Sequence, residues 1–191
     1  MRELTYYVAV TIDGFIAAPD GDFGFFPLRG NHLTGLIKEF PETMPVHLRA
    51  ALGLTDISAR QFDTVLMGRR TYEPAARAGL TSAYPHLDQH VFSRTMREAP
   101  DPSVTLVNED PVAYVRRLKQ RSGLGIWLCG GSDLAGALLP ELDQLILKVN
   151  PVLIGSGRPL FNRQFEVQQF TFMGTQAYDS GVVVQRYRRT Q

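Results

Sequence analysis

The chain has 191 residues, of which 44% are apolar and 20% are charged, and its formal net charge is +1. This composition is ordinary for a soluble globular protein, the length suits one domain, and the near-neutral charge gives no reason to expect nucleic acid or an anionic membrane as a partner. Cys129 is the only cysteine, which excludes an internal disulfide and a cysteine-based zinc site.

The first predicted element is a central strand. Residues Leu4 to Ile12 are rich in β-forming side chains, and Asp13-Gly14 ends the run. Because the segment turns polar at Thr11 and has no small-residue cleavage site, we interpret it as a strand and not as a signal peptide. No apolar run is long enough to span a bilayer. Together with the single cysteine, these features predict a cytoplasmic protein.

A loop and two short helices are predicted next. Ile16 to Phe26 (IAAPDGDFGFF) is a Gly-, Asp- and Phe-rich loop, and loops of this length are often functional. Its aromatic rings either cover a ligand or pack into a small core of their own. Helical patterns follow at His32–Phe40 and Pro45–Leu52. His32 and His47 are expected at the surface, because neither has a partner at metal-site spacing.

The following strand ends in residues suited to phosphate. Thr64–Met67 predicts a buried strand, and the next four residues lead into a helix that runs to Arg77. Two guanidinium groups and a hydroxyl at a helix entrance suit a phosphate better than other partners, although a solvated surface is also compatible with them. These four residues are Gly68, Arg69, Arg70 and Thr71.

A third strand shows the same feature. His90–Phe92 is short and apolar, and it ends in Ser93, Arg94 and Thr95, which again combine hydroxyl and guanidinium groups. A fourth strand is predicted at Val104–Val107.

An amphipathic helix follows at Asp110–Arg121. It places three apolar residues toward the core and leaves a basic face that we expect to be solvated. The inward residues are Val112, Val115 and Leu118, and the basic ones are Arg116, Arg117, Lys119 and Arg121.

The most informative stretch is LGIWLCGGSDLAGALL, at residues 124–139. Its strand, Ile126–Cys129, stops at two glycines and enters a helix, with Cys129 expected in the core. Glycines remove side-chain bulk, and the free N–H groups of a helix start attract an anion. A tight turn that binds nothing is equally compatible with the pattern. The residues of the turn are Gly130 and Gly131, then Ser132 as the expected N-cap, Asp133 and Leu134.

The chain closes with three strands. Leu142–Val149 is followed, after a Gly- and Pro-rich loop, by the alternating strands Glu166–Phe172 and Val182–Arg188. A turn containing Gly174 and Gly181 joins these two into an antiparallel hairpin.

The alternation of strands and helices predicts a single α/β domain with a mostly parallel central sheet, flanking helices and the C-terminal antiparallel hairpin. Ligands of such sheets bind beyond the carboxyl ends of the strands. If the three phosphate-compatible ends are neighbours, one dinucleotide would reach all of them. The excess of arginine favours NADP over NAD. The first strand lacks a G-x-G-x-x-G turn, which counts against a Rossmann domain.

Five motifs, taken in order and spacing, resemble the dihydrofolate reductase fold, and more closely the reductase domain of the bifunctional riboflavin-biosynthesis deaminase/reductase. The resemblance covers nearly all of residues 1–191, as one domain, and residues 28–60 form a longer segment than the family leads us to expect. The motifs are VAVTIDGFIA (8–17), DTVLMGRRTYE (63–73), FSRT (92–95), WLCGGSDLAGALL (127–139) and NPVLIGSGRPLF (150–161).

The resemblance implies NADPH as cofactor, a homodimer, and a cis peptide between Gly130 and Gly131. It also implies the cofactor contacts, which group by the part of the nucleotide they would touch. Ala9 and Ile16 would flank the nicotinamide; Arg69, Arg70 and Thr71 would hold the 2′-phosphate and pyrophosphate; Ser93 and Arg94 would lie beside the adenosine; Gly130, Gly131, Ser132, Asp133 and Leu134 would line the pyrophosphate and nicotinamide ribose.

The substrate side departs from dihydrofolate reductase, which needs a carboxylate on its first helix. The corresponding segment, Arg29–Thr34, has no acidic residue. Glu39 is the nearest candidate, but it lies too far along the chain to match that position. The riboflavin-pathway relatives keep an aspartate where Asp13 stands, and it could orient a substrate hydroxyl or relay a proton, or simply form the turn. No zinc deaminase signature is present.

The sequence therefore predicts an NADPH-dependent reductase that transfers hydride to a C=N or C=O group of a small polar substrate, resembling the 5-amino-6-(5-phosphoribosylamino)uracil reductase of riboflavin biosynthesis. The proton would come from Asp13 or from water. Two alternatives stay open: dihydrofolate reductase-type activity, and a non-catalytic module that binds a dinucleotide or flavin.

Overall fold

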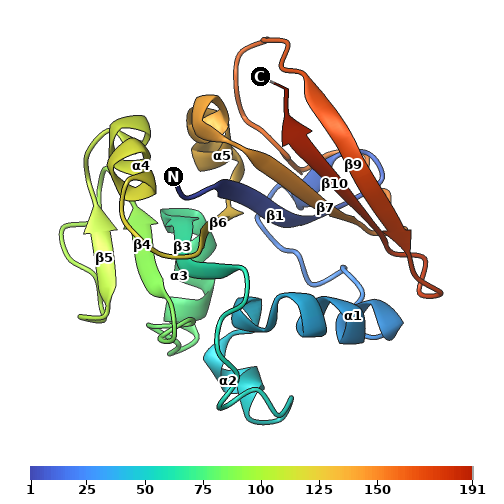
Figure 1. The fold of residues 1–191 in the computed structure, drawn as a ribbon, viewed down its shortest axis with the longest axis horizontal. Helices are drawn as coiled ribbons and strands as arrows, with labels where there is room; N and C mark the ends of the chain where they lie inside the picture. The colour runs from blue at the N-terminus through green and yellow to red at the C-terminus, as the bar shows by residue number, and fades with distance from the viewer. Residues whose placement is uncertain (191) are drawn as a thin grey trace.

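A computed structural model describes residues 1–190 and places eight strands in one sheet, in the order β5-β4-β3-β6-β1-β7-β10-β9 (Figure 1). A second, two-stranded sheet joins β2 to β8. The strands are β1 (Leu4–Val10), β2 (Phe15–Ala17), β3 (Phe62–Gly68), β4 (Asp88–Phe92), β5 (Val104–Val107), β6 (Gly125–Gly130), β7 (Gln144–Val149), β8 (Arg158–Pro159), β9 (Phe170–Ala177) and β10 (Val183–Arg189). The helices are α1 (Asn31–Glu39), α2 (Val46–Arg49), α3 (Arg69–Arg77), α4 (Pro111–Lys119) and α5 (Ser132–Leu138), with 3-10 turns at Pro41–Thr43 and Leu139–Glu141.

The predicted central strand is confirmed as β1, which lies between β6 and β7 and pairs with both in parallel. Six strands, from β5 to β7, form the parallel part of the sheet, and β10 joins it antiparallel to β7. Both faces of β1 are covered, which is why its sequence is apolar almost throughout and does not alternate. The predicted α/β class and mostly parallel sheet are thereby confirmed.

Two apolar clusters fill the two faces of the sheet. One contains Tyr6 of β1 together with Leu118 of α4 and Leu138 of α5. The other contains Tyr7 of β1 together with Leu36 of α1. Figure 1 shows α4 and α5 on one side of the sheet and α1 on the other.

The C-terminal hairpin forms, but its first strand lies further along than predicted. β9 spans Phe170–Ala177 in place of 166–172, and Gly174 lies inside the strand, not in the turn. Gly174 has φ +155° and pairs with Arg186, where the register of the ladder shifts. The glycine therefore serves a β-bulge, and the partner strand sets a register that alternation alone does not reveal.

The segment between α1 and β3 is held by two buried charged side chains. Glu42 is 1% exposed, and its carboxylate accepts hydrogen bonds from three backbone N–H groups at the start of β3. Arg49 is also buried and donates to three backbone carbonyls of the surrounding loops. The helix predicted at Pro45–Leu52 is only Val46–Arg49, because the chain folds around the Arg49 guanidinium. The carbonyls belong to Pro41, Leu54 and Ile57.

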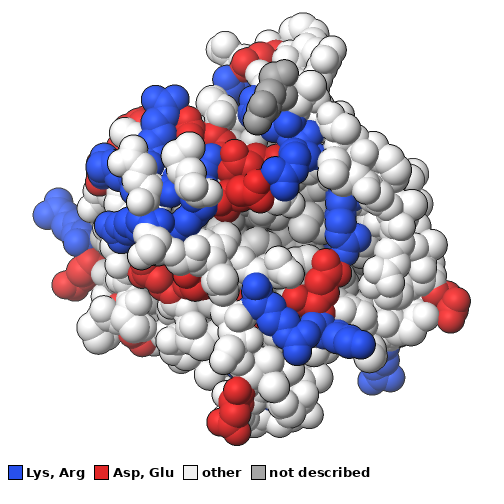
Figure 2. All heavy atoms as spheres, in the orientation of Figure 1, with Lys and Arg blue, Asp and Glu red and all other residues white. Residues whose placement is uncertain are grey.

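Two residues expected at the surface are buried. His32 is 3% exposed, and its Nδ1 lies 2.8 Å from the Ser180 hydroxyl oxygen, because the hairpin turn packs on the start of α1. Lys119 was expected on a solvated basic face but is 6% exposed, and its ammonium lies 2.6 Å from a carboxylate oxygen of Asp143. The other basic residues of α4 remain at the surface, where Figure 2 shows basic and acidic side chains interspersed.

Candidate functional site

The three strand ends that carry phosphate-compatible residues are neighbours. β4, β3 and β6 lie side by side, and β1 follows β6. Gly68 at the end of β3 pairs with Phe92 on one side, and Met67 pairs with Gly130 on the other. Because parallel strands end at one edge, the predicted residues from three distant parts of the chain form one continuous row.

The turn after β6 is built from two glycines, of which Gly130 is buried and Gly131 is half-buried. The peptide between Gly130 and Gly131 is cis, as the sequence predicted. A Cβ on Gly131 would lie 3.3 Å from the Thr71 hydroxyl oxygen, and one on Gly68 would lie 3.6 Å from the Gly131 nitrogen. The ends of β3 and β6 thus approach closely because neither carries a side chain there.

The start of α5 differs in one respect from the prediction. Gly131, and not Ser132, is the N-cap, since the Ser132 hydroxyl donates to the carbonyl of Pro159. Asp133 is exposed and accepts a hydrogen bond from the Asn162 side chain at 2.6 Å. Leu134 is buried in the cluster on the α5 side of the sheet.

The entrance of α3 carries the basic groups. Arg69 forms an ion pair with Glu73 at 3.1 Å, and Arg70 lies 3.6 Å from Asp133, so that it links α3 to α5. The side chains of Arg70 and Asp133 are both more than 60% exposed. An ion pair with this much solvent contributes little free energy, so Arg70 can exchange its carboxylate for a phosphate at small cost.

The end of β4 is built around a serine. Ser93 is buried, and its hydroxyl oxygen accepts hydrogen bonds from the backbone N–H groups of Thr95 and Met96. This arrangement fixes the turn and leaves Arg94 exposed at the same edge of the sheet. Ser93 therefore shapes this end of the row, while Arg94 supplies its charge.

Asp13 connects the end of β1 to a loop far along the chain. Its carboxylate accepts hydrogen bonds from the Thr11 hydroxyl at 2.6 Å and from the Gly155 N–H at 2.7 Å, with a longer one from Ile154. The Thr11 hydrogen bond is the main reason that the pKa of Asp13 is lowered. The group is ionised at neutral pH and already accepts several hydrogen bonds, so it is better suited to hold this loop than to supply a proton.

The residues predicted to flank a nicotinamide lie at the end of β1. Ala9 is on the face shared with Tyr7, whereas Ile16, in β2, packs against the cluster on the opposite face. The aromatic rings of the following loop divide between two environments, since Phe26 is buried and Phe23 is exposed.

Lys148 is a candidate that the sequence analysis missed, although a lysine inside the apolar run LILKV of β7 is a visible signal. It lies opposite Ala9 in the ladder, and its ammonium is 4.3 Å from the centre of the Tyr7 ring. Loss of hydration lowers the pKa of Lys148 to about 8.

The first helix supplies no free acid to this region. Glu39, the only carboxylate of α1, is ion-paired with Arg186 at 2.6 Å.

A hollow of about 620 Å³ lies elsewhere, beside α5, and Asp133 is the only predicted cofactor residue in its lining. Within residues 1–190, no group of three or more His, Cys, Asp or Glu side chains is placed to hold a metal ion, and no helix is both long and apolar enough to cross a membrane.

Comparison with known proteins adds a family and a fold. The model of the RibD C-terminal domain family matches residues 2–184. "Uncharacterized protein YwjB" of Bacillus subtilis (strain 168) is 31% identical over 185 residues, which cover 95% of each chain. The "Putative riboflavin biosynthesis protein" of Shewanella sp. PV-4 superposes with a TM-score of 0.72 at 21% identity, over 100% of both chains.

A further solved structure is the diaminohydroxyphosphoribosylaminopyrimidine deaminase/5-amino-6-(5-phosphoribosylamino)uracil reductase of Thermotoga maritima. It superposes with a TM-score of 0.63 at 15% identity, over 99% of this chain but only 57% of that one. At these identities the two solved structures establish the shared fold alone.

Proposed function

Because this chain belongs to the RibD C-terminal domain family, we propose that it is an NADPH-dependent reductase acting on a C=N or C=O group of a small polar substrate. One observation carries the proposal, namely the unbroken row of strand ends from β4 through β3 and β6 to β1. These ends span three strand spacings, or about 14 Å, a length that suits an extended dinucleotide. The adenosine would lie at β4 and the nicotinamide at β1.

The residues of the row fit such a cofactor. Gly68, Gly130 and Gly131 carry no side chain at the point where β3 and β6 end, and such backbone would allow a pyrophosphate to approach closely. Arg69 and Arg70 stand beside these glycines and can pair with the 2′-phosphate that distinguishes NADPH from NADH. NADPH, when bound, supplies the hydride, and the protein supplies position and electrostatics.

The end of β1 would then orient the reacting ring. Ala9 and Ile16 present small and aliphatic surfaces there, on opposite faces of β1. Asp13 ties this strand end to the loop at Gly155, and β2 ties it to β8. These connections hold the ring's expected surroundings in one geometry, which is the main contribution a protein makes to hydride transfer.

The first substrate to test is 5-amino-6-(5-phosphoribosylamino)uracil, which the name of the Thermotoga maritima enzyme gives as its reductase substrate. Folate reduction is less favoured, because it needs a carboxylate free to contact the substrate. The α1 candidate, Glu39, is already neutralised by Arg186.

Fluorescence titration tests the cofactor. Trp127 is the only tryptophan, lies three residues before Gly130 on β6, and is buried, so bound nicotinamide is expected to quench it or accept its energy. Saturable binding with a preference for NADPH over NADH is the expected result. Oxidation of NADPH in the presence of the uracil substrate would then establish turnover. Absence of binding by either nucleotide would contradict the proposal, and binding without turnover of any acceptor would favour a non-catalytic module.

A further inference from the structure

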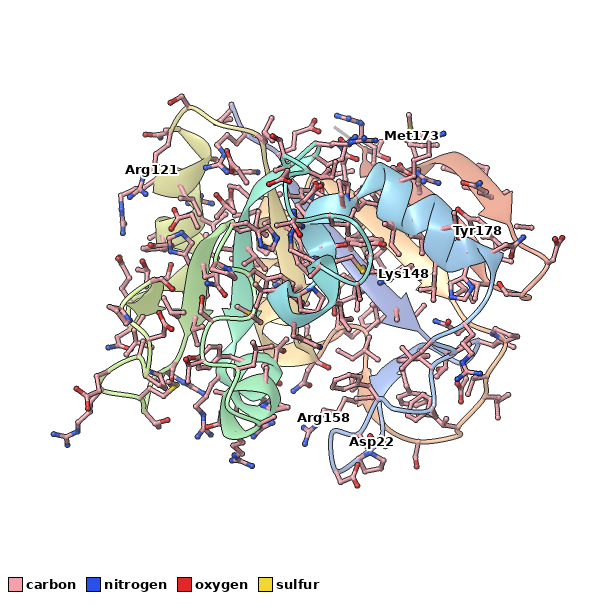
Figure 3. All side chains as sticks on the ribbon, turned by 90° about the horizontal axis from the view of Figure 1, so that it is seen from below. Asp22, Arg121, Lys148, Arg158, Met173 and Tyr178 are labelled. Carbon is pink, nitrogen blue, oxygen red and sulfur yellow. The ribbon has the colours of Figure 1, made fainter. Side chains whose placement is uncertain are left out.

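Three neighbouring strands become more accessible toward their carboxyl ends on the face covered by α1. Tyr7 of β1 and Trp127 of β6 are buried, but the next residues on that face, Ala9 and Cys129, are only half-buried, as is Lys148 of β7. Ala9 and Lys148 are direct partners in the ladder. Seen from the side of α1, Lys148 lies near the centre of the sheet face (Figure 3). This opening adjoins the place where the reacting ring of the cofactor is proposed to lie.

Lys148 has no counter-charge at this position. Within residues 1–190, no carboxylate oxygen lies within 4 Å of its ammonium, and the described contact is with the face of the Tyr7 ring at 4.3 Å. Lys119, by contrast, is neutralised by Asp143. A cation–π contact of this kind offsets part of the lost hydration and leaves the N–H groups of the ammonium free to meet a ligand.

The groups that face Lys148 come from three elements. The Tyr7 ring of β1 contacts its ammonium, and Cys129 of β6 and His32 of α1 are near enough to interact with it electrostatically. Burial raises the pKa of the Cys129 thiol to about 12, and burial lowers the pKa of His32, so neither residue brings a negative charge to the site at neutral pH. Lys148 therefore brings the positive charge to this opening, and its lowered pKa favours release of a proton.

We propose that Lys148 is the proton donor of the reduction and contacts the substrate directly, an inference that rests on the proposed function. Its place on β7, directly opposite Ala9 of β1, would put it beside the nicotinamide proposed to lie at the end of β1. Asp13, the donor that the sequence suggested, is engaged with Thr11 and Gly155 and is held ionised.

The step balances with the reagents of the proposed reaction. Hydride forms a new C–H bond at the carbon of the C=N or C=O group. The π-electron pair of the C=N or C=O double bond moves to its nitrogen or oxygen. An N–H bond of the Lys148 ammonium breaks, and its proton passes to that atom. The neutral amine then recovers a proton from water. The substrate atom opposite Lys148 is thus the nitrogen or oxygen next to the carbon that is reduced.

The first test measures the titration of the Lys148 amine by NMR and does not require turnover. The chain has only three lysines, Lys38, Lys119 and Lys148, so methylation with ¹³C-formaldehyde gives few NMR signals. The signal that disappears in Lys148→Met is expected to titrate near pH 8 and to shift when NADP⁺ is added. The signal of Lys38, which is exposed on α1, is expected to stay in place.

The second test uses unmethylated variants. Lys148→Met keeps the aliphatic stem over Tyr7 but removes the proton, and it is expected to lower kcat about 100-fold or more while NADPH affinity changes little. Lys148→Arg keeps the charge but does not release a proton near neutrality, so it is expected not to restore the rate. Lys38→Met serves as the matched control and is expected to behave as the wild type.

Two results would overturn this role and leave the cofactor proposal intact. One is a Lys148 signal that NADP⁺ leaves unmoved while Trp127 reports binding. The other is a normal kcat in Lys148→Met or Lys148→Arg. Failure of the wild type to bind NADP⁺ would instead remove the proposed function, and this inference with it.

Discussion

The carboxylate of Asp13 accepts a hydrogen bond from the backbone N–H of Gly155 at 2.7 Å, across 142 positions of sequence. This bond closes the end of β1 against the loop that leads into β8. The same carboxylate accepts a hydrogen bond from Thr11, so one side chain fixes both the turn after β1 and the loop beside it.

The first prediction concerns the pH dependence of stability. Hydrogen bonds, that from Thr11 foremost, lower the pKa of Asp13 in the folded state. Its stabilising effect is therefore complete above the unfolded carboxyl pKa of about 4 and is lost as the pH falls through the lower folded value. Asp13→Asn is expected to unfold at lower urea concentration at pH 7 and to converge with the wild type near pH 2. An equal difference at both pH values would show that the charge of Asp13 is irrelevant.

The second prediction concerns the glycine turn. Gly131→Val places a side chain against the Thr71 hydroxyl and into the space proposed for the pyrophosphate, so NADPH affinity is expected to fall at least about 10-fold. Fluorescence titration measures the affinity, and circular dichroism checks folding. Gly79→Ala is the control, since Gly79 has φ +86° and open space around it at the far end of α3. Unchanged affinity in folded Gly131→Val would remove the pyrophosphate from this turn.

The third prediction concerns cofactor choice. Arg69→Ala is expected to weaken NADPH binding by about 10-fold or more, the usual effect of losing one charge-assisted hydrogen bond, and to change NADH binding little. Arg77→Ala is a matched control, because Arg77 bonds the same Glu73 from the other end of α3. Parallel titrations with both nucleotides measure the effect. Equal losses for NADPH and NADH would exclude Arg69 as the partner of the 2′-phosphate.

The fourth prediction concerns the ion pair between buried Lys119 of α4 and half-buried Asp143, the residue before β7. Lys119 donates to the Glu141 carbonyl at 2.8 Å and pairs with Asp143, which in turn accepts the Leu4 N–H at 2.7 Å. Lys119→Met removes the ion-pair partner of the Asp143 carboxylate and is expected to lower the free energy of unfolding by about 2 to 3 kcal/mol. Urea unfolding measures the change, with exposed Lys38→Met as the control. A change within experimental error would mean that Asp143 is stabilised sufficiently by the Leu4 N–H.

Much of the sheet could be predicted because its strands are buried on both faces. Apolar runs such as Thr64–Met67 and Ile126–Cys129 mark β3 and β6 directly, and glycines mark where they end. The row of strand ends followed from these positions once the strand order was known. The order itself, which puts β3 beside β6 and β6 beside β1, depends on contacts between distant segments.

What escaped prediction depends on partners far away in sequence. The register of β9 is set by β10 and by a bulge at Gly174. The burial of His32 comes from the hairpin turn at Ser180, 148 residues later. Lys148 looks like an interruption of an apolar strand until Ala9 and Tyr7 are placed beside it. Local patterns carry no information about such neighbours.

The position of β1 between β6 and β7 also bears on how the chain is synthesised. β1 is synthesised before both of its neighbours, since it pairs with residues 126–128 on one side and 144–149 on the other. Until about residue 149 has emerged, the apolar faces of Leu4–Val10 lack one of their flanking strands. The nascent chain therefore carries an apolar segment without its full sheet partners until late in the synthesis of this domain, and transiently exposed segments of this kind are prone to aggregate.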